Sequence, residues 1–309
     1  MIVLLGAVVA GGFAYLNHVV GAIPRIPVNF TVLRTSATTG GMTVLLTGKQ
    51  IGPTGATSES GTSGESGLIM LLHLNANHQA GGAVSIPPQT EVNVPGYGQM
   101  QLWDTLKAGG PSLLVRTVQS MTGVPINHYA TLDFNHVAST INAIGGVTVT
   151  LPDNASSFGH VFHKGVNQLT GTTAMDYVRQ PSLSETGRVL RQQSLLRAVL
   201  AKLYADDLLR HPVIMMRVLG SFKTMLTVDS NFSNSQIESM ANQLAHLSPS
   251  AETFVTAPTR TDGSAATQAN GPAAKLAPES GQLWKAINQD SLATFAQRYP
   301  ATVTPAAPN

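Results

Sequence analysis

Segments with the periodicity of strands alternate with segments of helical periodicity along the middle of the chain, and this alternation limits the fold more than any other feature. The pattern predicts a strand over residues 128–132, a helix over 135–144 and a strand over 147–151. Elements alternate in this way when helices pack on a sheet, because each must bury an apolar face against another. The sequence therefore predicts an α/β fold.

The positions of proline and glycine also agree with an α/β fold, because they mark the ends of predicted helices and strands. Pro111 follows two glycines and begins a predicted helix, which Gly123 ends. A loop rich in Gly, Ser and Thr runs from residue 48 to 67. Three short apolar runs predict strands, at residues 43–47, 68–74 and 83–86.

The composition allows a large core and excludes some functions. Of the 309 residues 43% are hydrophobic and 11% are charged, and the net charge is only +2. Nothing in this balance resembles the basic stripe of a nucleic-acid binder, so we expect no nucleic-acid partner. The chain has no cysteine, which excludes disulfides, thiolate nucleophiles and cysteine metal sites but leaves the redox compartment open.

Residues 1–23 contain no Asp, Glu, Lys or Arg. This length is close to the roughly 20 residues that span a bilayer as a helix. We therefore expect a transmembrane anchor over residues 1–23, followed by a linker over 24–41. A buried core helix and a cleaved signal peptide are the alternatives, and the second lacks a convincing cleavage site.

Arginines are concentrated in one part of the chain, with six of the eleven between residues 179 and 217. Arg179, Arg188 and Arg191 lie near the start of one predicted amphipathic helix. Because the chain is otherwise poor in charge, this cluster beside an apolar stripe indicates a specific anionic partner.

The predicted helix begins at a capping box formed by Ser182 and Glu185. Arg188 lies on its apolar stripe, where a guanidinium must be paired, and free N–H groups at a helix start also favour an anion. Phosphate is the natural candidate. The alternative is that Arg188 and Arg191 pair with Glu185, with Asp176 or with the carboxyl-terminal half. The apolar stripe comprises Leu195, Leu196, Val199 and Leu203.

Two histidines lie in a segment, residues 156–169, that shows no regular periodicity. His160 and His163 are three residues apart, but no third ligand lies nearby in the sequence. We therefore predict no metal site there.

Short motifs follow one another in a fixed order over residues 42–205. They include Ser85-Ile86-Pro87, Val94-Pro95-Gly96-Tyr97-Gly98, Asp133-Phe134, Gly145-Gly146-Val147, Leu169-Thr170-Gly171, Tyr177-Val178-Arg179-Gln180 and Gly187-Arg188-Val189-Leu190-Arg191-Gln192-Gln193. In this order and spacing the chain resembles the LytR-CpsA-Psr family of bacterial cell-wall enzymes.

The resemblance implies a fold, a location and an activity. The fold would be a central mixed sheet flanked by helices, which together enclose an apolar tunnel for a lipid. One N-terminal helix would anchor the chain in the cell membrane as a single-pass protein, with the main domain outside the cytoplasm. The family transfers glycopolymers from a polyprenyl pyrophosphate carrier to peptidoglycan, so these are the implied partners.

The resemblance also implies roles for individual residues. The pyrophosphate would be bound by Arg179, Arg188, Arg191 and Gln192, of which the first two would be catalytic. The lipid tunnel would be lined by Leu195 and Val199.

The chain departs from the family where the reaction is expected. Gln50 and Gly67 stand where the family usually has aspartates that bind Mg²⁺. The resemblance implies Mg²⁺ as the cofactor, but these replacements remove two of the oxygen ligands that this ion needs. Pro88 and Pro181 replace arginines, and residues 101–103 replace a Lys-x-Asn motif.

Two functions remain open at this point. The chain is a glycopolymer transferase with impaired catalysis, or it is a non-catalytic relative that binds a polyprenyl-phosphate lipid or a partner enzyme. The lost charges favour binding over catalysis, because phosphoryl transfer depends on positioning and charge neutralisation. A transcriptional regulator is disfavoured, since no helix-turn-helix pattern occurs.

The remaining boundaries follow from composition. We expect an α/β domain over residues 42–258, then a loop and a C-terminal helix over 259–299, with the helix itself at 281–297. A disordered tail is expected over residues 300–309.

Overall fold

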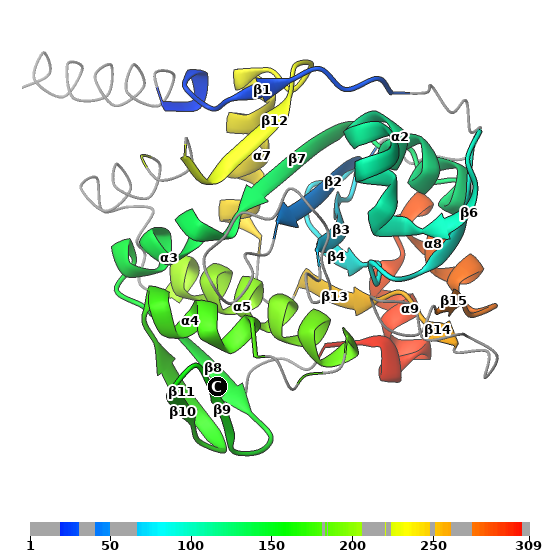
Figure 1. The fold of residues 1–309 in the computed structure, drawn as a ribbon. Coiled ribbons are helices and arrows are strands. Elements are labelled where there is room, and N and C mark those ends of the chain that lie inside the picture. Colours follow the sequence, from blue (N-terminus) through cyan, green and yellow to red (C-terminus); the bar gives the residue numbers. More distant parts are fainter. Residues whose placement is uncertain are drawn as a thin grey trace, which may run out of the picture.

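The computed structural model describes residues 19–30, 41–49, 67–180, 183, 185–205, 220, 224–247, 251–260 and 274–304. Its centre is a seven-stranded sheet with the strand order β1-β12-β7-β2-β3-β4-β13 (Figure 1). In chain order these strands are β1 (Arg25–Ile26), β2 (Met42–Lys49), β3 (Leu68–Leu74), β4 (Gly81–Ser85), β7 (His128–Asp133), β12 (Leu226–Asp229) and β13 (Glu252–Thr256).

The sheet mixes parallel and antiparallel pairs. Strand β2 pairs with β7 in parallel and with β3 in antiparallel orientation. Strand β4 is antiparallel to β3 and parallel to β13, which comes from the far end of the chain. The predicted α/β fold with a central mixed sheet is therefore confirmed. The helices are α2 (Thr105–Thr122), α3 (Phe134–Ala143), α4 (Gly171–Val178), α5 (Glu185–Ala205), α7 (Asn234–His246), α8 (Ser280–Asn288) and α9 (Leu292–Arg298).

Both faces of the sheet are covered by helices (Figure 1). Along β3, Leu68 and Met70 belong to a core shared with α3, α4 and α5. Ile69 and Leu71 belong to the opposite core, shared with α2, α8 and α9. A strand buried on both faces has a continuous apolar sequence without alternation, which explains why β3 is apolar at nearly every position.

Helix α2 contains the helix start that the sequence predicted at Pro111. Gly109 and Gly110 have non-helical backbone angles, with φ of −157° and 64°, so the regular helix begins at Pro111. Gly123 ends it with a left-handed φ of 67°, which glycine adopts without steric cost, and its N–H donates to the carbonyl of Gln119. The predicted bounds of this helix are confirmed.

Two short antiparallel ribbons lie beside α4 (Figure 1). Strand β8 (Val147–Leu151) pairs with β11 (Gly165–Leu169), and β9 (Ala155–Ser157) pairs with β10 (His160–Phe162). The prediction of an irregular segment over residues 156–169 is therefore wrong. Alternation is too brief in three-residue strands to give a periodic signal.

The N-terminal part differs from the expected anchor and linker. Val20 and Ile23, within the expected anchor, are buried in the core that contains Met70. Strand β1, within the expected linker, pairs in parallel with β12. Residues 1–18 lie outside the described residues, so the anchor stays a prediction for them. Among the described helices, none has the length and hydropathy needed to cross a membrane.

The C-terminal part is more ordered than its composition predicts. Two helices, α8 and α9, replace the single predicted one, and they are separated at Asp290, whose φ is +53°. The prediction of a disordered tail is wrong for residues 300–304. The N–H of Thr304 donates to the carbonyl of Phe254, and this threonine is buried. Residues 305–309 lie outside the described residues. The smaller elements are β5 (Glu91–Val94), β6 (Gly98–Gln101), η1 (Leu102–Asp104), β14 (Thr259–Arg260), β15 (Lys275–Leu276) and η4 (Pro300–Thr302).

Candidate functional site

The candidate site lies where α4 ends and α5 begins. Helix α4 starts at a capping box in which Thr170 and Thr173 each bond the other's backbone N–H. Arg179 is its C-cap residue. Helix α5 then runs back along α4, and Tyr177 of α4 contacts Arg191 of α5. The predicted capping residue Ser182 lies outside the described residues, as does Pro181.

Arg179 is held by the last turn of α4. Its Nη2 atom lies 3.1 Å from Oδ1 of Asp176, and its Nε–H donates to the carbonyl of Met175 at 3.2 Å. The other carboxylate oxygen of Asp176 lies 2.8 Å from Nδ1 of His160. Asp176 is therefore a buried carboxylate shared between Arg179 and His160, and it is not the partner of Arg191 that the sequence left open.

Arg191 is held by Tyr177. Its Nη1–H donates to the Tyr177 carbonyl at 3.0 Å, and the guanidinium carbon lies 4.5 Å from the centre of the tyrosine ring. Burial lowers the pKa of Arg191, and the nearby Tyr177 opposes this shift. Burial also raises the pKa of Tyr177, although Arg191 and a hydrogen bond with Ser194 lower it. The phenol thus stays neutral, and Tyr177 does not cancel the charge of Arg191.

The two glutamines of the Arg-Gln-Gln motif differ in their contacts. Gln193 is fully buried, and its Nε2 donates to Ser85 Oγ at 2.7 Å and to the Val255 carbonyl at 2.9 Å. Gln192 is 6% exposed, and its Oε1 has no hydrogen-bond partner in the described part of the chain. Buried polar atoms are normally paired. The unpaired atom of Gln192 is an acceptor and does not itself bind a phosphate oxygen, so the predicted role of Gln192 would fall to its N–H₂ group and stays a prediction. Gln193, in contrast, has a structural role.

Arg188 lies one helical turn before Gln192, so the two side chains share a face of α5. Its side chain is half-buried. The structure thus brings Arg179 and Arg191 to the last turn of α4, and it places Arg188 beside Gln192. Their predicted binding of pyrophosphate remains a prediction.

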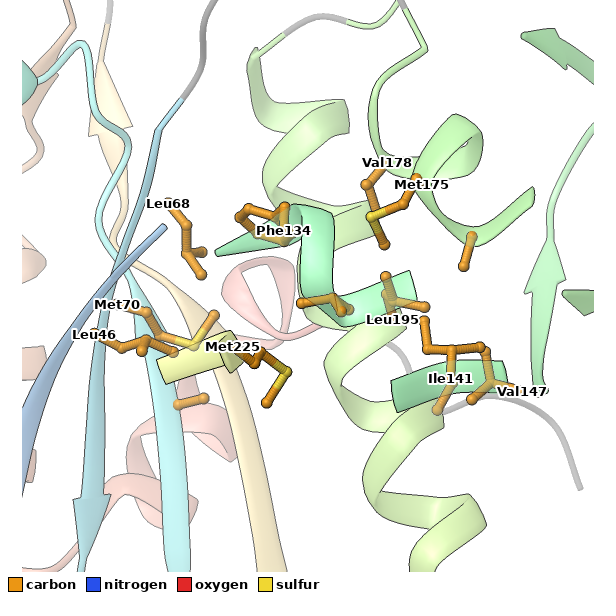
Figure 2. Packing of buried hydrophobic residues seen from close by; sticks show 14 of the residues in the cluster. Leu46, Leu68, Met70, Phe134, Ile141, Val147, Met175, Val178, Leu195 and Met225 are labelled. Carbon is orange, nitrogen blue, oxygen red and sulfur yellow. The ribbon is translucent and has the colours of Figure 1, made fainter. Parts of the chain in front are cut away.

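The predicted tunnel residues lie further along α5, after Arg188 and Arg191. Leu195 is buried in the core between the sheet and α3, α4 and α5, and Val199 packs against that core. Figure 2 shows Leu195 near Ile141 and Val147, with Leu68 and Met70 of the sheet on the other side. An apolar environment therefore adjoins the arginines, while a lipid tunnel remains a prediction.

Three of the departures from the family pack against one another. A Cβ atom on Gly67 would lie 1.9 Å from Cζ3 of Trp103, so the indole fills the space of a side chain at position 67. The backbone N–H of Trp103 donates to the carbonyl of Pro88 at 2.9 Å. Gly67 and Pro88 are both buried. Position 67 therefore offers no ligand for Mg²⁺, and Trp103 occupies the room that such a ligand would need. Gln50 lies outside the described residues.

The two histidines in this region have separate surroundings. His160 is paired with Asp176, while the backbone of His163 is bound by Asn167. Among the described residues, no three His, Asp or Glu side chains lie together in a way that could hold a metal ion.

Two supports of the site were not predicted from the sequence. Tyr177 holds Arg191, and the ring centre of Phe158 lies 5.5 Å from the guanidinium carbon of Arg179. A local signal existed for a third contact, because Asp176 and Arg179 have the i,i+3 spacing of helical neighbours. Phe158 reaches Arg179 through pairing of β9 with β10, which leaves no local sequence signal.

Comparison with known proteins gives relatives that match about half of the chain. The polyisoprenyl-teichoic acid–peptidoglycan teichoic acid transferase TagU of Bacillus cereus is 30% identical over 183 residues, which cover 58% of this chain and 60% of TagU. The probable cell wall biosynthesis protein LcpB of Corynebacterium glutamicum is 31% identical over 163 residues, which cover 49% of this chain and 39% of LcpB. The matched part therefore spans less than two thirds of either relative.

The fold and the family comparison agree with these relatives. The LytR-Csp2A-Psr enzyme from Actinomyces oris superposes with a TM-score of 0.68 at 19% identity, covering 86% of this chain and 96% of that one. At this identity the superposition shows a shared fold. The sequence model of the LytR_cpsA_psr family matches residues 24–271, which is well over half of the chain, and the chain therefore belongs to the LytR_cpsA_psr family.

Proposed function

We propose that this protein takes part in bacterial cell-wall assembly by binding a glycopolymer linked to a polyprenyl pyrophosphate carrier. The observation that carries the proposal is that Arg179 and Arg191 both bond carbonyls in the last turn of α4, those of Met175 and Tyr177. Each guanidinium keeps further N–H donors, because arginine has five. Two such groups beside an apolar core suit a ligand with a pyrophosphate head and a hydrocarbon tail.

The same residues suggest how the carrier would be held. Arg179, Arg188 and Arg191 would bind phosphate oxygens, and the amide of Gln192 would complete their hydrogen bonds. Leu195 and Val199 would contact the prenyl chain. In a transfer reaction the arginines would stabilise negative charge on the departing carrier phosphate as the glycopolymer moves to peptidoglycan.

The location follows from the substrate. A polyprenyl carrier lies in a membrane and peptidoglycan lies outside it, so the protein would belong at the outer side of a bacterial cell membrane. An anchor within residues 1–18 would place it there. The names of TagU and LcpB, a teichoic acid transferase and a probable cell wall biosynthesis protein, support this placement.

A second candidate is binding of the carrier without transfer. The Gly67–Trp103–Pro88 contacts favour it, because they replace a metal-ligand position and an arginine position with packed apolar groups. Mg²⁺ would neutralise developing charge in such a reaction, but the described residues supply no ligand for it at position 67.

One assay separates the two candidates. The full chain is incubated with a polyprenyl-pyrophosphate-linked glycan and peptidoglycan, with Mg²⁺ or with EDTA, and released carrier and glycan-bound peptidoglycan are measured. Transfer in either condition excludes the non-catalytic candidate, and loss of transfer in EDTA would show that Mg²⁺ binds elsewhere than position 67. Binding of the loaded carrier without release supports the second candidate. Absence of both binding and release would overturn the proposed function.

A further inference from the structure

The β9–β10 hairpin has an unusual turn. Its two loop residues, Phe158 and Gly159, both have left-handed backbone conformations, with φ of 49° and 84°. Turns of this kind favour Asn-Gly, because most side chains are strained at positive φ. A phenylalanine at the first position therefore costs stability, so the contacts of its side chain must account for its presence.

The ring of Phe158 faces Arg179. The ring centre lies 5.5 Å from the guanidinium carbon, within the range of a cation–π contact. The ring is 42% exposed, so it contributes little to the core. Because Phe158 packs little against the core, its contact with Arg179 is the feature that distinguishes this strained residue.

His160, which follows the turn, acts on Arg179 through Asp176. Its Nδ1 atom lies 2.8 Å from one carboxylate oxygen of Asp176, and the other oxygen lies 3.1 Å from Nη2 of Arg179. Asp176 is buried, while His160 and Arg179 are partly exposed. The carboxylate thus connects the hairpin to the arginine and fixes the direction of its planar fork.

The hairpin is firmly attached to α4. Phe162 of β10 is fully buried and packs edge-on against Tyr177, with ring centres 5.9 Å apart. Tyr177 in turn contacts Arg191. Anchoring of this kind holds the hairpin tip at a constant distance from both arginines, which is what positioning of a binding group requires.

We propose that the hairpin tip positions Arg179 for anion binding, with Phe158 and, through Asp176, His160 as positioning residues. The inference rests on the proposed function, in which Arg179 binds the pyrophosphate of the carrier. For a variant without the Asp176 carboxylate, this positioning role predicts a change in anion affinity opposite to the change that charge alone predicts. Removing the Asp176 carboxylate makes the site more positive, which by charge alone would tighten anion binding. If Asp176 positions Arg179, the same removal weakens anion binding.

The first test replaces the strained residue. In Phe158→Asn the turn gains a residue suited to positive φ, so the unfolding midpoint in urea is expected to stay the same or rise. The Kd of the full chain for geranyl pyrophosphate, measured by calorimetry, is expected to rise about three-fold because the cation–π contact is lost. An unchanged Kd would overturn the role of Phe158, since the variant remains folded.

The second test uses a double-mutant cycle. Asp176→Asn is expected to raise the Kd for geranyl pyrophosphate about ten-fold in the wild-type background, and to change it little in the Arg179→Ala background. His160→Ala is expected to weaken binding less than Asp176→Asn, because the His160 ring lies against the Asp176 carboxylate without a hydrogen bond that meets the usual geometry. Tighter binding by Asp176→Asn, or equal effects in both backgrounds, would overturn the proposal.

Failure of the proposed function has a different result. If wild-type protein does not bind geranyl pyrophosphate, or Arg179→Ala leaves the Kd unchanged, the arginine site itself is wrong. If Arg179→Ala weakens binding while Phe158→Asn and Asp176→Asn do not, the site stands and only the positioning role falls.

Discussion

At the scale of single residues, Gly67 stands where the resemblance implies an acidic residue, and the space for a side chain is filled. The ring of Trp103 lies where a side chain at position 67 would begin, and the Trp103 N–H is bonded to Pro88. Trp103 thus contacts Gly67 through its ring and Pro88 through a backbone hydrogen bond. Restoring an aspartate at position 67 alone would force a carboxylate against an indole, so the replacements are coupled.

This coupling can be measured. Gly67→Ala is expected to lower the free energy of unfolding by about 1–3 kcal/mol, because the added methyl group overlaps the Trp103 ring. In a Trp103→Ala background the same change should have almost no effect, since the space is open. Urea denaturation of the four proteins of the cycle measures both values. Additive effects would show that the ring and position 67 are independent.

At the scale of elements, Asp229 at the end of β12 joins this strand to β7. Its Oδ2 lies 3.2 Å from Nδ1 of His128 and accepts from the Tyr129 N–H, while Oδ1 accepts from the Asn231 N–H. The His128 ring stacks on Phe232, with centres 3.9 Å apart. Burial would raise the pKa of Asp229, but the bonds from His128, Tyr129 and Asn231 outweigh it and hold this pKa below its ordinary value.

The lowered pKa predicts how stability depends on pH. The folded state binds the proton of Asp229 less readily than the unfolded state, so its contribution is fully present above the ordinary aspartate pKa of about 3.9 and is lost as pH falls through the lower folded value. Urea denaturation between about pH 6 and pH 3 should therefore give a steeper loss of stability for wild type than for Asp229→Asn. Parallel curves for the two proteins would contradict the assignment.

At the scale of the whole molecule, α5 connects the candidate site to distant parts of the chain. Gln193 donates to Ser85 at the end of β4 and to Val255 in β13, and its Oε1 accepts from Thr304 near the C-terminus. Arg197, one turn later, donates to the Thr304 carbonyl at 2.8 Å. Arg188 and Arg191 therefore lie on a helix that is fixed to the sheet and to the last described residues.

Gln192 and Gln193 are neighbours in α5, so their variants provide a matched test of the contacts that Gln193 makes. Gln193→Met leaves several buried groups unpaired and should lower the free energy of unfolding by about 2–4 kcal/mol. Gln192→Met removes an oxygen that has no partner among the described residues, so stability should be unchanged or higher. Denaturation midpoints compare the two directly. Equal losses would mean that the contacts of Gln193 do not distinguish it from Gln192.

The sequence predicted those features that local patterns encode. The α/β class, strand β3 and the bounds of α2 follow from apolar periodicity and from glycine and proline at the ends of elements. Features that depend on distant pairing could not be predicted. Strand β13 pairs with β4, about 170 residues earlier in the chain, and Thr304 is bound by Phe254, Gln193 and Arg197.

The candidate site divides in the same way. Its arginines were predicted because they cluster in sequence and match family motifs. Their supports were missed, because Phe158 and His160 reach Arg179 and Asp176 through a hairpin of three-residue strands. Contacts made by such short elements leave no periodic signal.

The central claim is that the arginines of α4 and α5 bind the pyrophosphate of a polyprenyl-linked glycopolymer. The most direct measurement is the Kd of the full chain for this carrier, compared between Arg188→Ala and Arg116→Ala, which removes an equal charge from the exposed face of α2. We predict at least a ten-fold weaker Kd, about 1.4 kcal/mol, for Arg188→Ala and no change for Arg116→Ala. Equal Kd values for the two variants would contradict the account.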